Sequence, residues 1–318
     1  KKQDVNWPTT IGIASPLIND GQVNNRGLEI SALWKDRIGK DIGYYVSANV
    51  ATLRNRLTNI GAANPDGSKP VWTYEDDYHY KELTPYRSAE GKPLYSYYLL
   101  RTDGVFQTDA EAAAYVNSNG QRLQPKAKAG DLKFVDIDKN GSIGEGDYEF
   151  RGNAMPKMTY AFSAGFSYKK FSFDFMLQGS YGAKLFNAYK YTTLNEAVGS
   201  FNRSEKILKA LKGPTYDVPR ISMTDDNDNF GRISDWYLES GSYLRMKNIS
   251  ISYSFSDLLR KLAFFNQRQS TLDLTLSCDN LFTITPYSGI DPEVGGVGLD
   301  CGQYPVSRTI SLGVKIKF

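Results

Sequence analysis

Residues 308–318, which end the chain, most constrain its fold, because apolar and polar side chains alternate along them without a break. An extended strand would place on one face Ile310, Leu312, Val314, Ile316 and Phe318. Its other face would carry Ser311, Gly313, Lys315 and Lys317. A strand that crosses a bilayer needs about 9–11 residues, apolar toward lipid and polar toward the lumen. A strand of a soluble β-sandwich can alternate in the same way, so this pattern alone leaves both folds open.

Composition allows a membrane protein that crosses with strands. The 318 residues are 41% hydrophobic, and the mean hydropathy is -0.45. No window approaches the ~20 apolar residues that a spanning helix needs. A β-barrel needs apolar residues only at every second position, and it concentrates aromatic rings at the membrane interfaces. Aromatic residues make up 13% of this chain, which favours a barrel, and the net charge of +3 gives no sign of nucleic-acid binding.

Seven segments in total show this alternation and predict strands. The first six comprise residues 28–35, 44–50, 158–168, 171–178, 248–255 and 272–277. The connections between them are short, very long, short, very long, moderate and long. Outer-membrane barrels have short periplasmic turns and longer extracellular loops. The alternation therefore predicts an all-β transmembrane antiparallel barrel, with Phe318 on the periplasmic side and all three long loops outside the cell.

Seven strands would leave two unpaired edges facing hydrocarbon, which a membrane does not tolerate. We therefore expect the chain to be the C-terminal portion of a larger barrel. Three short helices are predicted within its connections. The first follows the capping box of Thr108 and Glu111, the second spans residues 205–212 between Ser204 and Gly213, and the third spans residues 257–263.

Residues 136–147 follow the spacing of a calcium-binding loop. The candidate ligands are Asp136, Asp138, Asn140, Ser142 through its backbone carbonyl, and Asp147. A glycine stands at position 6 of this loop, where the chain must turn sharply. Position 12 is Asp where an EF-hand has Glu, and the flanks read as extended, so a helix-loop-helix sensor is not expected. The sequence predicts a bound Ca²⁺ that stiffens a long loop, with Mg²⁺ as the other ion and an ion-free Asx-turn loop as the alternative.

Other polar features give weaker signals. The acidic run 225–229 lacks ligand spacing and is interpreted as a solvated loop rather than a metal site. His79, the single histidine, is expected at the surface. Cys278 and Cys301 would either pair across a loop or remain separate thiols. No nucleophile with a base is recognisable, so we do not expect an enzyme.

Aromatic residues are dense between positions 71 and 98. They could stack on sugars or pack against a partner, and packing within the loop itself is the equal alternative. They include Trp72, Tyr74, Tyr78, Tyr95, Tyr97 and Tyr98.

Over nearly its whole length the chain resembles the C-terminal part of SusC/RagA-type TonB-dependent outer-membrane transporters. The motifs that carry this resemblance are residues 24–29, 130–133, 152–157, 178–182, 241–249, 280–282 and 287–293. The resemblance implies a roughly 22-stranded barrel with a plugged lumen. Residues 1–318 would then be the C-terminal segment of that barrel, with the plug domain and the earlier strands absent from this chain.

The resemblance also implies a function in nutrient uptake. It implies TonB-dependent active import of oligosaccharides or peptides across the Gram-negative outer membrane, with a SusD-like surface lipoprotein as a lid over the extracellular loops. The TonB complex would act through the missing N-terminal part. Two alternatives stay open: a passive porin or surface adhesin barrel, and a secreted calcium-binding β protein of a glycan-degrading system. The sequence does not decide between glycan and peptide cargo.

Overall fold

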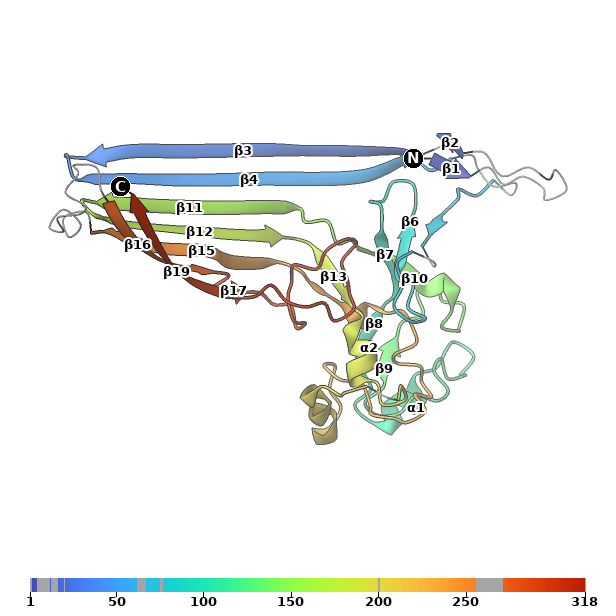
Figure 1. The fold of residues 1–318 in the computed structure, drawn as a ribbon. Helices are drawn as coiled ribbons and strands as arrows, with labels where there is room; N and C mark the ends of the chain where they lie inside the picture. The colour runs from blue at the N-terminus through green and yellow to red at the C-terminus, as the bar shows by residue number, and fades with distance from the viewer. Residues whose placement is uncertain are drawn as a thin grey trace.

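The computed structural model describes residues 2–4, 12, 17–19, 21–61, 67–74, 77–199, 201–255 and 271–317. Its largest element is an antiparallel sheet with the order β19-β16-β15-β12-β11-β4-β3, which forms the long upper layer of Figure 1. A short strand, β17 (Thr283–Ile284), also pairs with β15. The seven strands on the main path are β3 (Gln22–Ile38), β4 (Ile42–Asn59), β11 (Met158–Tyr168), β12 (Phe171–Tyr181), β15 (Tyr243–Ser254), β16 (Thr271–Asp279) and β19 (Thr309–Lys317). All seven predicted strands are confirmed.

The register gathers the apolar side chains onto one face of this sheet. Directly opposed residues of an antiparallel pair share a face. Ile30 pairs with Val50, which pairs with Tyr160. At the other edge Leu274 pairs with Val314. Leu312 is 74% exposed on this face, so the described part of the chain does not cover it. An apolar face of this extent is stable only against lipid or another apolar surface.

The opposite face of the sheet is polar. Asp174 and Ser172 on β12 point to it, and the Tyr45 hydroxyl on β4 donates a hydrogen bond of 3.0 Å to Asp174. Because successive side chains of a strand point to opposite faces, one alternation of residue types produces both faces. This is the arrangement expected of a barrel wall between lipid and lumen.

The long connections lie at one end of the sheet, and the short turns lie at the other. In Figure 1 the β3–β4 and β11–β12 turns and the end of β19 lie at the left, while the chain from β4 to β11 and from β12 to β15 extends to the right and below. The predicted segregation of loop lengths is confirmed for the described connections. Phe318 and the predicted helix 257–263 lie outside the described residues.

The long connections fold into a second unit, here called the loop body, comprising the described residues of 67–157, 182–242 and 285–307. It contains a four-stranded sheet of β10 (Tyr148–Gly152), β7 (Ser96–Leu100), β6 (Tyr86–Ser88) and β5 (Trp72–Thr73). A second small sheet joins β14 (Leu238–Ser240), β13 (Lys184–Asn187) and β18 (Leu299–Asp300), and β8 (Thr102–Val105) pairs with β9 (Leu132–Phe134). Near the N-terminus β1 (Lys2–Asp4) pairs with β2 (Leu17–Asn19).

The main cluster of buried hydrophobic residues lies in the loop body rather than in the large sheet. Tyr97, Phe186 and Tyr237 are fully buried. The Phe186 ring stacks on Tyr97 with centroids 6.2 Å apart and on Tyr237 with centroids 4.9 Å apart. Aromatic pairs of this kind stabilise beyond the area they bury, by about 0.5–1.5 kcal/mol each. The connections are therefore an ordered unit with its own hydrophobic core.

Five short helices interrupt the loop body. They are α1 (Asp109–Ala114), α2 (Tyr189–Leu194) and the 3₁₀ helices η2 (Glu145–Asp147), η3 (Glu205–Lys212) and η4 (Asp235–Tyr237). The Thr108 hydroxyl accepts a hydrogen bond of 3.1 Å from the Glu111 amide, as the capping box predicts. Ser204 and Gly213 cap η3 within the predicted bounds. Among the described helices, none has both the length and the apolar character that a membrane span requires.

Candidate functional site

The structure brings together three of the predicted metal ligands. Asp136, Asp138 and Asp147 each offer a carboxylate oxygen, and these oxygens lie within 4.8 Å of one another. Asp136 and Asp138 follow β9, whereas Asp147 ends η2 and is fully buried. The flanks are the extended strands β9 and β10, so the expectation that this is not a helix-loop-helix is confirmed.

Backbone amides hold the carboxylates of this loop in place. The Gly141 amide donates to Asp136 Oδ2 at 3.0 Å, and Gly141 adopts φ +85°, the left-handed conformation expected at this turn. Asp147 accepts from the amides of Ile137 at 2.6 Å and Gly144 at 2.7 Å. Asp136 Oδ1 is buried and has no hydrogen-bond partner among the described residues. A carboxylate oxygen buried in this way is a group that a cation would satisfy.

The remaining two predicted ligands are bonded within the loop. Asn140 Nδ2 donates to Asp138 Oδ2 at 2.8 Å, and Asn140 Oδ1 accepts from the Ser142 amide at 2.9 Å. These bonds are also those of consecutive Asx turns. The residues present fit a hard divalent cation, because three carboxylates form an all-oxygen donor set of the kind that Ca²⁺ and Mg²⁺ prefer.

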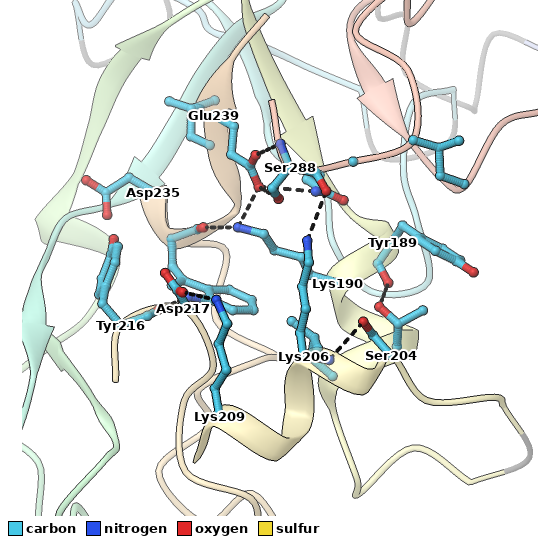
Figure 2. Close-up of a pocket in the computed structure, with 17 residues that line it drawn as sticks. Tyr189, Lys190, Ser204, Lys206, Lys209, Tyr216, Asp217, Asp235, Glu239 and Ser288 are labelled. Carbon is cyan, nitrogen blue, oxygen red and sulfur yellow. Dashed lines mark hydrogen bonds and ion pairs between the residues drawn. The ribbon is translucent and has the colours of Figure 1, made fainter. Parts of the chain in front are cut away.

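A pocket of about 500 Å³ is the second candidate site. Figure 2 shows its charged side chains pointing toward one another from α2, η3 and β14. Lys190 Nζ lies 2.8 Å from Glu239 and donates to the Trp236 carbonyl at 2.9 Å. Lys206 Nζ donates to the Ser288 carbonyl at 3.0 Å. The pocket thus combines ammonium and carboxylate groups with the aromatic side chains of Tyr189, Tyr216 and Trp236.

Burial and mutual attraction both change the pKa values of Lys190 and Glu239, which form an ion pair in this pocket. Burial lowers the pKa of Lys190, and the Glu239 carboxylate partly opposes this shift. Burial acts to raise the pKa of Glu239, but Lys190 and Ser288 outweigh it and hold that pKa below its usual value. The two side chains thus partly offset each other's burial cost, with 2.8 Å between Lys190 Nζ and the Glu239 carboxylate. A polar ligand with hydrogen-bonding groups would find both donors and acceptors here.

Sequence reasoning missed this pocket, because its walls come from three separate stretches of the chain. They are residues 187–217, 235–239 and 288–290. Lysine and acidic residues at these positions look like ordinary surface charges in the sequence. The helix predicted at residues 205–212 was the single local signal.

The acidic run 225–229 is structural, so its interpretation as a solvated loop is wrong for part of it. Asn229 is fully buried and Asn227 is 6% exposed. Asn229 Oδ1 accepts a hydrogen bond of 2.8 Å from the Leu132 amide on β9, and its Nδ2 donates to Asp131 at 2.8 Å. Burial raises the pKa of Asp225 to about 6. The run therefore fastens one long connection to another.

The aromatic segment, His79 and the two cysteines can also be located in the structure. Tyr74 and Tyr97 of the aromatic segment lie in the loop-body core, which confirms packing within the loops for these two rings. His79 is exposed, as expected. Cys278 and Cys301 are both free thiols. Cys278 lies on β16 opposite Ile310, whereas Cys301 is exposed in the last long connection.

Comparisons with known proteins show which proteins this chain resembles in sequence and in structure. No family model matches the chain. Two TonB-dependent receptors are similar along almost all of it: receptor P3 of Formosa agariphila, 28% identical and covering 100% of this chain, and SusC of Bacteroides thetaiotaomicron, 22% identical and covering 94%. Among solved structures, the RagAB peptide transporter is 24% identical, with a TM-score of 0.70 over 99% of this chain. The RagAB peptide importer in its open-open state gives a TM-score of 0.71 at 23% identity.

The sheet, its uncovered apolar face and the structural likeness define the class: the chain has the all-β fold of a TonB-dependent transporter barrel, and the barrel is not closed in this chain. Within that class the resemblance to SusC/RagA-type transporters is confirmed. The chain spans only 31% of the length of receptor P3 and 27% of that of SusC.

Proposed function

We propose that this chain forms part of the wall and the outer loops of an active nutrient importer in the Gram-negative outer membrane. The observation that carries the proposal is the seven-stranded sheet whose apolar face lies uncovered, with its long connections gathered at one end. In this proposal the chain is the C-terminal segment of the barrel, and the plug and earlier strands belong to another part of the polypeptide. The long loops face outside, and the end of β19 faces the periplasm.

The cargo in this proposal is an oligosaccharide or a peptide. A SusD-like lipoprotein would cover the loop body as a lid, and TonB would supply energy through the plug. The ordered core of the loop body supports this role, because a rigid loop surface binds a partner at a lower entropic cost than flexible loops do. The similarity to the RagAB peptide transporter supports peptides as one of these two cargo classes.

We also propose that the loop 136–147 binds Ca²⁺, with Mg²⁺ as the other ion. The buried oxygen of Asp136 and the clustering of three carboxylates support it. Such an ion would offset the mutual repulsion of the carboxylates and stiffen the connection between β9 and β10. Its role is structural and does not involve catalysis.

Uptake by whole cells tests the importer proposal. Cells lacking the full-length protein and cells carrying it are supplied with labelled oligosaccharides and labelled peptides, with and without an uncoupler of the proton gradient. We expect accumulation of one cargo class that depends on the protein and stops with the uncoupler. Uptake that continues with the uncoupler would support a passive porin instead. Absence of uptake of either class would favour an adhesin.

Isolation in mild detergent tests the partner and the remaining alternative. We expect the full-length protein to sediment with outer membranes and to copurify with a surface lipoprotein after solubilisation. A protein that stays in solution without detergent would be the secreted calcium-binding alternative.

A further inference from the structure

Three arginines stand together on the apolar face of the β3–β4 hairpin, just beyond the last apolar residues. Arg26 lies directly opposite Arg54, and Arg56 lies opposite Asn24. The register between β3 and β4 is unbroken from Val23 to Ile38, so these side chains share the face of Leu28 and Ile30. They line a cavity of about 220 Å³, together with Asn24 and Thr58.

This arginine cluster (Arg26, Arg54 and Arg56) has no acidic partner among the described residues. All three side chains are exposed, and none of them forms an ion pair in the part of the chain that the structure describes. The one side-chain bond of the cluster runs from Arg26 Nε to Asn24 Oδ1, at 3.2 Å. Like charges directly opposite each other across two strands are destabilising. A bound anion would remove this cost.

The position of the arginine cluster along β3 and β4 indicates which layer of the membrane would surround a bound anion. Along β3, Arg26 precedes Leu28 by two residues, which separates them by about 7 Å at the rise of a strand. The polar headgroup layer occupies roughly 5–7 Å on each side of the ~30 Å hydrocarbon core. If Leu28 and Ile30 contact hydrocarbon, the guanidinium groups of Arg26 and Arg54 lie in the headgroup layer. Guanidinium groups bind phosphate through two parallel hydrogen bonds.

We infer that this arginine cluster binds the phosphate of a lipid headgroup in the outer leaflet. The inference rests on the membrane orientation given under the proposed function, since the cluster lies at the end of the sheet from which the long connections extend. The outer leaflet of a Gram-negative outer membrane contains phosphorylated glycolipid. This lipid is the ligand that we propose for the arginine cluster. The contact would anchor the barrel wall at a fixed depth, as interfacial side chains do in other membrane proteins.

The test compares two triple variants of the full-length protein isolated from native membranes. In the first, Arg26→Gln, Arg54→Gln and Arg56→Gln remove the cluster. In the matched control, Lys35→Gln, Arg37→Gln and Lys40→Gln remove three positive charges at the other end of the same hairpin. Copurified phosphoglycolipid is counted by native mass spectrometry. We expect a loss of at least tenfold in bound lipid for the first variant and none for the control.

Further arms separate the lipid from other anions. Dephosphorylated glycolipid should fail to restore the bound lipid, and inorganic phosphate alone should not displace it. Equal lipid retention by both triple variants would overturn the inference. So would displacement by inorganic phosphate, which would indicate a free-anion site, or loss of the lipoprotein partner with lipid retained, which would indicate a protein interface.

Folding is controlled by a milder substitution. Arg26→Gln alone removes the like-charge pair and leaves two arginines, so we expect a folded barrel with partial lipid loss. If that variant folds and retains all its lipid, the inference fails. Uptake is recorded in parallel, because lipid binding without active uptake would refute the importer function and leave the lipid site standing.

Discussion

At the residue scale, two partly buried carboxylates, Asp136 and Asp225, depend strongly on their surroundings. Asp136 has one oxygen without a hydrogen-bond partner beside two other carboxylates, whereas Asp225 is partly buried against the residues that follow it. Asp225 accepts hydrogen bonds from the amides of Asn229 at 2.9 Å and Phe230 at 3.0 Å. Each carboxylate accepts hydrogen bonds from backbone amides within a long loop, so we expect each to help order that loop. Substitution of either residue tests this expectation.

Replacing Asp136 and Asp138 with Ala should loosen the loop that follows β9. In the presence of Ca²⁺ we expect cleavage by an added protease within residues 136–147 to become several-fold faster, because the ligands that cross-link the loop are gone. A chelator should accelerate cleavage of the unmodified protein to a similar rate. Asp226→Ala, which removes an exposed carboxylate elsewhere, serves as the control. Identical cleavage of the unmodified protein with and without chelator would refute the metal site.

Asp225 predicts a pH dependence of the loop body. Its pKa is raised from 3.8 to about 6, so the folded state holds its proton more tightly than the unfolded state does. The stabilisation from this proton is fully present below pH 3.8 and is lost as the pH rises through about 6. Cleavage within residues 222–232, corrected for the protease's own pH profile, should therefore increase between pH 4.5 and 7. Asp225→Asn should flatten this profile, whereas Asp226→Asn should leave it unchanged. A profile unaffected by Asp225→Asn would contradict the assignment.

At the scale of elements, alternation assigns each strand residue to the apolar or the polar face of the sheet, and the proposed function assigns these faces to lipid and lumen. On β19, Leu312 and Ser311 are neighbours in the chain but lie on opposite faces, and both pair with β16 in the same register. Leu312 is 74% exposed. A charge at these two positions should therefore have very different consequences for membrane assembly.

Leu312→Arg should impair assembly of the full-length barrel, because a cation on the lipid face near the bilayer midplane costs about 2–4 kcal/mol. Ser311→Arg places the same charge on the luminal face and should assemble normally. The fraction of folded protein in outer membranes, seen as the band whose migration changes on heating, measures both. If both variants assemble equally well, the assignment of this face to lipid is wrong.

At the scale of the whole molecule, two edges of the sheet remain to be paired. β3 and β19 each have one neighbour in the described sheet, and an open sheet edge is not tolerated in hydrocarbon. We propose that further strands of a longer polypeptide pair with these edges, since this chain covers only 31% of the length of receptor P3. The closing strands would come from the remainder of such a polypeptide.

The intact mass of the denatured polypeptide from native membranes tests this explanation. We expect roughly three times the 35.6 kDa of this chain. A mass near 35.6 kDa would contradict a single-polypeptide barrel. The importer proposal would then require a separate subunit that supplies the other strands, and copurification would have to reveal it.

Alternation and connection length were enough to predict the strands, their two faces and the separation of long from short connections. Successive side chains of a strand point to opposite faces, so Leu312 and Ser311 could be assigned to different faces without knowledge of the neighbouring strands. The calcium-loop spacing of Asp136 and Asp138 is equally local. Such features need only adjacent residues, and for that reason they could be predicted.

The packing of the long connections, in contrast, depends on contacts between residues far apart in the sequence. Arg245 on β15 is 3% exposed and bonds Asp291 at 2.7 Å as well as Glu293, although 46 residues separate Arg245 from Asp291. Likewise Asn229 meets Asp131, and Lys190 meets Glu239. Each of these contacts requires distant segments to be brought together by a shared core. No local periodicity encodes such a meeting, because it depends on the path of the whole chain.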